Sequence, residues 1–250
     1  MNAASGARAA RTRLAPPYPS LGHLPGSRTG PRDRTVSAAT ARACTVAGAA
    51  LPGTTVTVQE KLDGSCVMVA RLDGRVVALG RDGARADDSP NAGRRMFARW
   101  VAAEAPRFDA LLEDGERAAG EWLALVHGTR YALTHEPFVL FDLLSSSASE
   151  RTVRKASPVV EARAREHGFS TPHVVHRGAP LSIAEARALL GDRGRHGADD
   201  RAEGVVYRVE RADRVLIVAK LVEAAKIDGR FLPENTGAPA LWNFHDGLDL

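Results

Sequence analysis

A two-residue turn between two strand-like runs constrains the fold of this chain more than any other feature of its sequence. The apolar runs Cys66–Leu72 and Arg75–Arg81 are separated only by Asp73-Gly74. Asp-Gly between two such runs is a strong signal for a β-hairpin. A second pair of runs, Glu203–Arg211 and Val215–Val222, is joined by a short polar turn. Because hairpins pair neighbouring strands antiparallel, the sequence predicts a sheet built mainly from antiparallel strands.

Periodicity predicts the remaining elements. Alternating apolar residues favour strands at 55–62, 118–126 and 137–144, and helical spacing favours helices near 37–47, 91–112 (interrupted at Pro106), 158–167 and 181–190. Ser182 opens the last helix as its cap, and residues 191–202 are typical of a mobile loop. We therefore expect an α+β domain that is rich in antiparallel sheet, with helices packed around the outside.

Charge and proline mark off the start of the chain. Residues 1–34 contain six arginines, and Asp33 is their only acidic residue. We expect a basic N-terminal extension over residues 1–50, packed on or flexible beside a core domain of residues 51–235, with a C-terminal tail over 236–250. The formal net charge of +4 weakly favours a polyanionic partner. A solvated basic tail is an equally good interpretation of the arginines.

Several classes of protein are disfavoured by the composition. No apolar run approaches the roughly 18 residues that span a bilayer, so we expect no membrane partner. The first fifty residues lack the continuous apolar stretch of a secretory signal, which predicts a cytoplasmic protein. Two cysteines, Cys44 and Cys66, suggest neither a disulfide framework nor a metal cluster.

Lysine is rare in this chain. Of the 34 basic residues, the lysines are Lys61, Lys155, Lys220 and Lys226. Arginine evidently serves wherever positive charge alone suffices, and a guanidinium cannot act as a nucleophile, whereas a lysine amine can. Each lysine is therefore a candidate for a chemical role.

One lysine lies in a short box at the end of a predicted strand, Lys61-Leu62-Asp63-Gly64-Ser65. Alone, this box is no more than a common turn. Further boxes follow it in order along the chain: Gly80-Arg81-Asp82-Gly83, Gly120-Glu121-Trp122, Phe138-Val139-Leu140-Phe141-Asp142, Glu203-Gly204-Val205-Val206 and Val218-Ala219-Lys220. With this ordered set, residues 55–222 resemble the covalent nucleotidyltransferases, which include ATP-dependent RNA ligases, DNA ligases and mRNA capping enzymes. Residues His23–Arg28 also resemble the RNA ligases.

The resemblance implies a nucleotidyltransferase (ATP-grasp-like ligase) fold and a role for each box. Lys61 would take AMP from ATP, and Lys220 would contact the α-phosphate. Arg81 would contact the ribose or phosphate, and Glu121 the ribose hydroxyls. Phe141 would stack on the base. Glu203 would lie near a metal ion, Mg²⁺ or Mn²⁺, since hard divalent ions favour carboxylate oxygen.

The chemistry of an attacking lysine sets a requirement for the site. A free lysine has a pKa of about 10.4, so its amine is almost entirely charged at neutral pH. A nearby cation lowers such a pKa by disfavouring the ammonium form, and Lys220 or a divalent ion would act in this way. Taken singly, the same residues have structural interpretations: Glu121 as a solvated strand residue, Arg81 as a hairpin-end charge, and Phe138 as core.

Two residues beside the nucleophile select among the relatives. Ser65 directly after the glycine, and Glu60 directly before the lysine, both resemble RNA ligases. A carboxylate at Glu60 would accept a hydrogen bond from the adenine amino group, which favours ATP. We therefore expect an ATP-dependent RNA ligase of RNA repair that joins 5′-phosphate and 3′-hydroxyl ends, with a nicked duplex or a tRNA as candidate substrates. The alternatives are a DNA ligase, a GTP-dependent capping guanylyltransferase, or a non-catalytic nucleic-acid-binding module.

The sequence also departs from the family pattern. Its last box would usually read Lys-x-Lys, but here Leu221 and Val222 follow Lys220. Lys226 is a candidate for the missing phosphate contact, although a surface position is the preferred interpretation. Only 28 residues follow Val222, too few for the oligonucleotide-binding (OB) barrel found in DNA ligases and capping enzymes. RNA capture would then depend on the N-terminal arm or on a protein partner. His127, Tyr131 and Lys155 are interpreted as structural or solvated residues.

Overall fold

The computed structural model describes residues 12–146 and 152–244, and these form two five-stranded sheets. The first sheet contains, in spatial order, β1 (Gly22–His23), β10 (Arg214–Val222), β9 (Gly204–Arg211), β2 (Thr55–Lys61) and β8 (Val174–Gly178). The second contains β4 (Arg75–Gly80), β3 (Ser65–Leu72), β5 (Arg117–Trp122), β6 (Phe138–Ser146) and β7 (Thr152–Arg154). Neighbouring strands are antiparallel except for β1 and β10, which are parallel.

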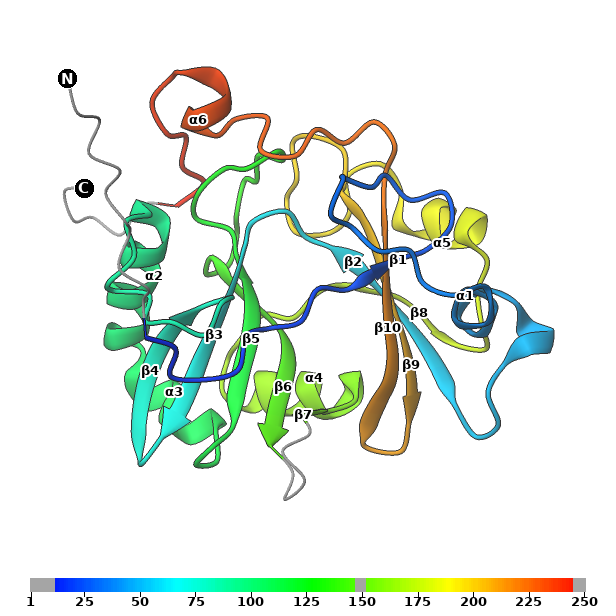
Figure 1. The fold of residues 1–250 in the computed structure, drawn as a ribbon, viewed down its shortest axis with the longest axis horizontal. Coiled ribbons are helices and arrows are strands. Elements are labelled where there is room, and N and C mark those ends of the chain that lie inside the picture. Colours follow the sequence, from blue (N-terminus) through cyan, green and yellow to red (C-terminus); the bar gives the residue numbers. More distant parts are fainter. Residues whose placement is uncertain (1–11, 147–151, 245–250) are drawn as a thin grey trace, which may run out of the picture.

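Helices cover the outside of both sheets (Figure 1). They are α1 (Ala38–Thr45), α2 (Ala92–Ala103), α3 (Ala105–Leu111), α4 (Ser157–Glu166), α5 (Ile183–Leu190) and α6 (Pro233–Thr236), with a 3₁₀ turn at η1 (Ala47–Ala49). Helices α2, α3 and α4 pack on the second sheet, whereas α1 and α5 pack on the first. Within the described residues, no helix has the length and apolar character needed to cross a membrane.

Local sequence signals explain several of these boundaries. Asp73 and Gly74 both have positive φ, 50° and 71°, as a tight hairpin turn between twisted strands requires. Ser182 caps α5 through a reciprocal capping box with Glu185. The long helix expected over 91–112 divides at Glu104, just before Pro106 enters the first turn of α3.

Each sheet has its own hydrophobic core. One core lies between the second sheet and α2, α3 and α4, and contains Phe97, Phe108, Trp122 and Phe138. The other lies between the first sheet and α1 and α5, and includes Tyr207. Two smaller clusters lie on the other face of the second sheet, against Ala15 and Tyr18, and around Leu62 of the lysine box.

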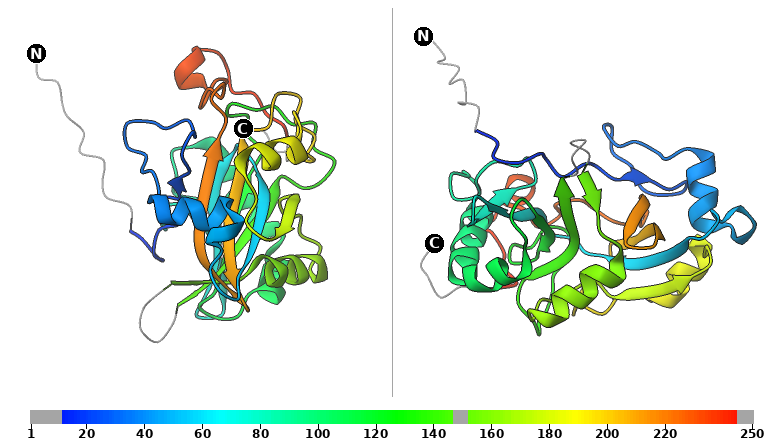
Figure 2. Two further views of the ribbon diagram at one scale, coloured as in Figure 1. Left: turned by 90° about the vertical axis from the view of Figure 1, so that its right-hand side faces the viewer. Right: turned by 90° about the horizontal axis from the view of Figure 1, so that it is seen from below.

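Several segments run between the sheets, and one of them is the chain from β7 through α4 to β8. The chain leaves the first sheet at Lys61, the last residue of β2, and enters the second at Ser65, the first residue of β3. Residues 13–36, here called the N-terminal strap, run from the end of β4 to β10 across the front of the molecule (Figures 1 and 2). The lysine box is thus one point at which the chain crosses between the two sheets.

The expected α+β fold with antiparallel sheet is confirmed, and within the described residues neither sheet closes into a barrel. The strand expected at 118–126 ends at Trp122, because residues 123–126 leave the ladder and enter a buried loop. Strands β7 and β8 were not expected; both are short and lack clear alternation. Residues 1–11 of the basic extension and 245–250 of the tail lie outside the described residues.

Candidate active site

A cavity of about 370 Å³ opens between the two sheets at this crossing point. Its walls come from the lysine box, from β5 and β6 of the second sheet, from β9 and β10 of the first, and from the strap. All seven residues expected in the site line it: Glu60, Lys61, Arg81, Glu121, Phe141, Glu203 and Lys220. The volume is within the range of ordinary small-molecule pockets. Residues scattered over 160 positions of sequence are therefore brought to one place.

Lys61 is held in the cavity by an ion pair. Its Nζ donates a hydrogen bond to Oε2 of Glu203 over 2.7 Å and a longer one, 3.2 Å, to the carbonyl oxygen of Leu62. The pairing of β2 with β9 sets Lys61 opposite Gly204, the residue after Glu203. Strand register therefore brings together two residues that are 142 positions apart.

Electrostatics within the protein favour the charged form of Lys61. Burial lowers the pKa of its ammonium group, but the negative charges of Glu203 and Glu121 outweigh that effect and raise the pKa overall. Burial also raises the pKa of Glu121, to about 7, and that of Glu203. The expected lowering of the Lys61 pKa is therefore not a property of the protein alone. It requires something that competes for the two carboxylates.

Glu121 holds the turn that follows the nucleophile. Its Oε1 accepts a hydrogen bond from the Gly64 amide over 3.0 Å, and its strand β5 pairs with β3 directly beside that turn. A Cβ on Gly64 would lie 2.4 Å from the carbonyl oxygen of Trp122, closer than any ordinary contact. The box needs glycine at position 64 because β5 passes so near. Glu121 accepts the hydrogen bond from this glycine, so it is not a solvated strand residue.

Lys226 is buried, and the preferred interpretation of it as a surface residue is wrong. Its ammonium group contacts Asp63 and the Thr129 hydroxyl, and Asp63 also accepts from the Gly128 amide over 2.8 Å. Lys226 does not line the cavity, so it does not supply the missing phosphate contact directly. A buried cation requires a partner, and the pairing of Lys226 with Asp63 holds Asp63 in place within the lysine box.

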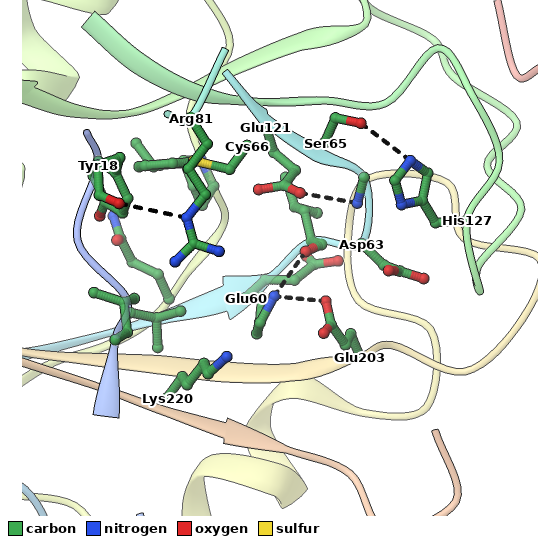
Figure 3. Close-up of a pocket in the computed structure, with 18 of the residues that line it drawn as sticks. Tyr18, Glu60, Asp63, Ser65, Cys66, Arg81, Glu121, His127, Glu203 and Lys220 are labelled. Atoms are coloured by element: carbon green, nitrogen blue, oxygen red, sulfur yellow. Dashed lines mark hydrogen bonds and ion pairs between the residues drawn. The ribbon is translucent and has the colours of Figure 1, made fainter. Parts of the chain in front are cut away.

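Cationic side chains approach the cavity from both sheets. Lys220 comes from β10, and Arg81 follows β4; Figure 3 shows their charged ends pointing toward the cavity from opposite sides. Burial and the positive charge of Lys61 lower the pKa of Lys220. Arg94 on α2 and Arg208 on β9 also line the cavity. Neither belongs to a family box, and only the tertiary structure reveals them.

The aromatic wall of the cavity is made by Phe141 and the strap. Phe141 is partly buried, and its ring meets Tyr18 edge-on with centroids 5.4 Å apart. Phe138, in contrast, is fully buried in the core, which agrees with its structural interpretation.

Glu60 is buried beside the 191–202 loop, where its Oε2 accepts from the Arg195 amide over 2.8 Å. Burial raises the pKa of Glu60 to about 7.

Two residues of the loop after β5 have closer links to the site than the sequence suggested. His127 lines the cavity and shares a hydrogen bond of 3.1 Å with the Ser65 hydroxyl, and burial lowers its pKa. The Tyr131 hydroxyl accepts from the Asp63 amide over 3.0 Å. Figure 3 shows His127 beside Ser65. His127 and Tyr131 therefore both hold the lysine box from the side of the second sheet.

The carboxylates suit a hard divalent cation only in part. Glu203 and Glu121 both influence the charge of Lys61. Within the described residues, no group of three or more His, Cys, Asp or Glu side chains forms a ready-made metal site. Mg²⁺ commonly binds through one or two carboxylates together with water and substrate phosphates. The residues present fit an ion of that kind, held by Glu203, and not a caged structural metal.

Known structures share this fold. A lysine-to-alanine mutant of the Naegleria gruberi RNA ligase with ATP and Mn aligns with a TM-score of 0.53 and 16% identity, over 86% of this chain and 62% of that one. A second such mutant with ATP and Mn gives 0.52 and 15%, over 86% and 63%. At these identities the likeness shows the fold alone.

Sequence comparison gives the family. No curated protein matches the chain. A family model described as RNA ligase matches residues 54–222, which is most of the chain and includes every box from Lys61 to Lys220. The chain therefore belongs to the RNA ligase family.

Proposed function

We propose that this protein is an ATP-dependent RNA ligase that acts through a lysyl-AMP intermediate at Lys61. The observation that carries the proposal is the position of Lys61: it is a partly buried amine paired with Glu203, in a cavity that Lys220 and Arg81 also line. Family membership supports ligase chemistry and an RNA substrate. The two neighbouring structures named above contain ATP and Mn.

In the first step the Lys61 amine attacks the α-phosphorus of ATP. The ammonium group must first lose a proton, and Glu203 is positioned to accept it, with Nζ and Oε2 2.7 Å apart. The Nζ–phosphorus bond then forms while the bond to the bridging oxygen breaks and pyrophosphate leaves. Lys220 and Arg81 stabilise the negative charge that develops on the phosphate oxygens. A divalent ion bound by Glu203 would neutralise further phosphate charge and weaken the hold of that carboxylate on Lys61.

In the later steps the AMP group moves to an RNA end. A 5′-phosphate oxygen attacks the adenylylated phosphorus and releases Lys61, and a 3′-hydroxyl then attacks the activated 5′-phosphate and releases AMP. Phe141 supplies a face for the purine ring, and Glu121 is within the same cavity to accept from the ribose hydroxyls. An acceptor at Glu60 favours the amino group of adenine over the oxygen of guanine.

The test is incubation with α-labelled ATP and Mg²⁺, followed by denaturing electrophoresis. Lys61→Ala and Lys61→Arg should both abolish the covalent label, since neither side chain offers an amine. Lys155→Ala is the matched control, because Lys155 is a lysine outside the cavity, and it should label normally. Absence of label from the unmodified protein would contradict the proposal.

Two further arms separate the alternatives. A stronger label from GTP than from ATP would indicate a guanylyltransferase, and preferential sealing of nicked DNA over nicked RNA would indicate a DNA ligase. Salt-sensitive RNA binding without any adduct, unchanged by Lys61→Ala, would indicate a binding module.

A further inference from the structure

The N-terminal strap contacts Arg81 and Lys220, two of the cationic residues that line the cavity. At its start, the Leu14 amide donates to the Gly83 carbonyl over 2.9 Å. The Tyr18 amide then donates to the Arg81 carbonyl over 2.8 Å, and the Arg81 guanidinium donates to the Ser20 hydroxyl over 2.9 Å. The strap therefore binds the backbone and the side chain of Arg81 at the edge of the second sheet.

The same strap then forms hydrogen bonds with β10, the strand that carries Lys220. Strand β1 pairs with β10 so that His23 lies opposite Lys220, and the Leu24 amide donates to the Lys220 carbonyl over 2.8 Å. The Ser27 hydroxyl accepts from the Val222 amide over 2.9 Å and shares a hydrogen bond of 2.7 Å with Nδ1 of His23. His23 is 1% exposed. These contacts give a structural role to His23, Leu24 and Ser27 of the His23–Arg28 motif, to which the resemblance gives no role.

Gly83, in the box Gly80-Arg81-Asp82-Gly83, allows the strap to pass close to the end of β4. Gly83 has φ +80°, and a Cβ there would lie 2.0 Å from the carbonyl oxygen of Ala15 in the strap. Only glycine accepts both that backbone conformation and so close an approach. The strap thus fits this surface closely, and its residues Tyr18 and Leu21 form part of the cavity wall.

We propose that the strap is a positioning element, in which Ser20 orients Arg81 and the His23–Ser27 pair orients Lys220 across the cavity. The inference rests on the proposed function, because it assumes that Arg81 and Lys220 both act on phosphate. Arg81 and Lys220 belong to different sheets, and the strap binds each of them directly. Transition-state stabilisation depends steeply on such placement, since a displacement of about 1 Å can cost 100-fold in rate.

The decisive variant is Ser27→Ala, which removes the acceptor for the Val222 amide without touching the cavity. The matched control is Ser37→Ala, which removes a strap-adjacent hydroxyl that caps α1 and does not contact β10. Ser27→Ala should slow single-turnover Lys61 adenylylation about 10-fold with little change in the KM for ATP. Ser37→Ala should leave that rate unchanged, and Ser27→Thr, which keeps the hydroxyl, should restore most of it.

A double-mutant cycle shows whether Ser27 acts through Lys220. In a Lys220→Ala background, Ser27→Ala should slow adenylylation by less than about 2-fold, because the side chain that it positions is already gone. A full 10-fold loss in that background, or equal losses for Ser27→Ala and Ser37→Ala, would overturn the proposal.

A second readout keeps this inference separate from the proposed function. If the unmodified protein forms no adduct, the ligase proposal fails, and hydrogen–deuterium exchange of residues 217–222 then decides the role of the strap. Faster exchange in Ser27→Ala than in Ser37→Ala would support the view that the strap holds β10 in place through Ser27. Equal exchange in the two variants would refute it.

Discussion

Asp142 offers the sharpest test of how the two sheets are joined. Its carboxylate is fully buried on β6 and accepts hydrogen bonds from the Tyr18 hydroxyl over 2.7 Å and from Nε of Arg154 over 2.6 Å. It also pairs with the guanidinium of Arg208 on β9, which is 2% exposed. One carboxylate therefore links the second sheet, the first sheet and the strap, and Asp142→Asn removes its charge while nearly keeping its shape.

The expected cost follows from these contacts. A hydrogen bond to a charged group contributes about 1.5–3 kcal/mol, and two of the three bonds join Asp142 to arginines. Removing one partner of a buried ion pair typically costs about 3–5 kcal/mol, because the other charge stays buried. Arg208 would retain only a marginal contact, 3.4 Å, with Glu210. We therefore expect Asp142→Asn to lower the free energy of unfolding by about 4 kcal/mol, a large part of the roughly 5–15 kcal/mol of a typical domain.

Urea denaturation at neutral pH measures this change directly. The matched control is Asp213→Asn, because Asp213 is 59% exposed and pairs with Arg214 over 3.5 Å at the surface. Exposed pairs contribute about 0–1 kcal/mol, so the control should hardly move the midpoint. A loss below about 1 kcal/mol for Asp142→Asn, with an unchanged slope, would refute the view that this carboxylate joins the sheets.

Three further predictions address single residues. Burial raises the pKa of Glu60 to about 7, above its unfolded value of about 4.5, so its contribution to stability is present below pH 4.5 and is lost as pH rises through 7. In Glu60→Gln the free energy of unfolding should fall less between pH 4.5 and pH 7, by up to about 3 kcal/mol. An unaltered dependence of the unfolding free energy on pH would contradict the raised pKa of Glu60. Glu203→Gln removes the main charge that raises the pKa of Lys61. Lys61 should then react faster with acetic anhydride at pH 8 in competitive labelling, and slower reaction would count against the ion pair. Gly83→Ala places a Cβ 2.0 Å from a strap carbonyl oxygen, whereas Gly115→Ala, at a similar φ of +82°, meets nothing within 4 Å. Thermal unfolding should therefore show a clearly larger loss for Gly83→Ala, and equal losses would mean that the strap does not press on Gly83.

Local elements were largely predictable because their causes are local. The Asp73-Gly74 turn and the Ser182 cap follow from conformational preferences of one or two residues, and the structure has both. The seven residues expected in the site all line one cavity, while the role of each in the reaction stays a prediction. Short strands such as β8 were missed, because five residues without alternation carry no pattern of their own.

Lys226 and Arg94 mark the limit of sequence reasoning within the site. Lys226 looked like a surface charge, yet it is buried against Asp63. Arg94 is one of several arginines on an amphipathic helix, and only the position of α2 places it in the cavity. Asp63 is 163 positions from Lys226 in sequence, and Arg94 reaches the cavity through the packing of α2 on β4, so no local spacing could reveal either position.

By itself, the sequence determined the hairpins, most of the helices and the ordered RNA ligase boxes, and it predicted Lys61 as the attacking lysine. The tertiary structure alone decided that the chain forms two sheets, that Lys61 is paired with Glu203, and that the strap contacts both Arg81 and Lys220. The reason is physical: turn and helix preferences depend on neighbouring residues, whereas burial, ion pairing and the pKa of a side chain depend on groups that only folding brings within a few ångströms.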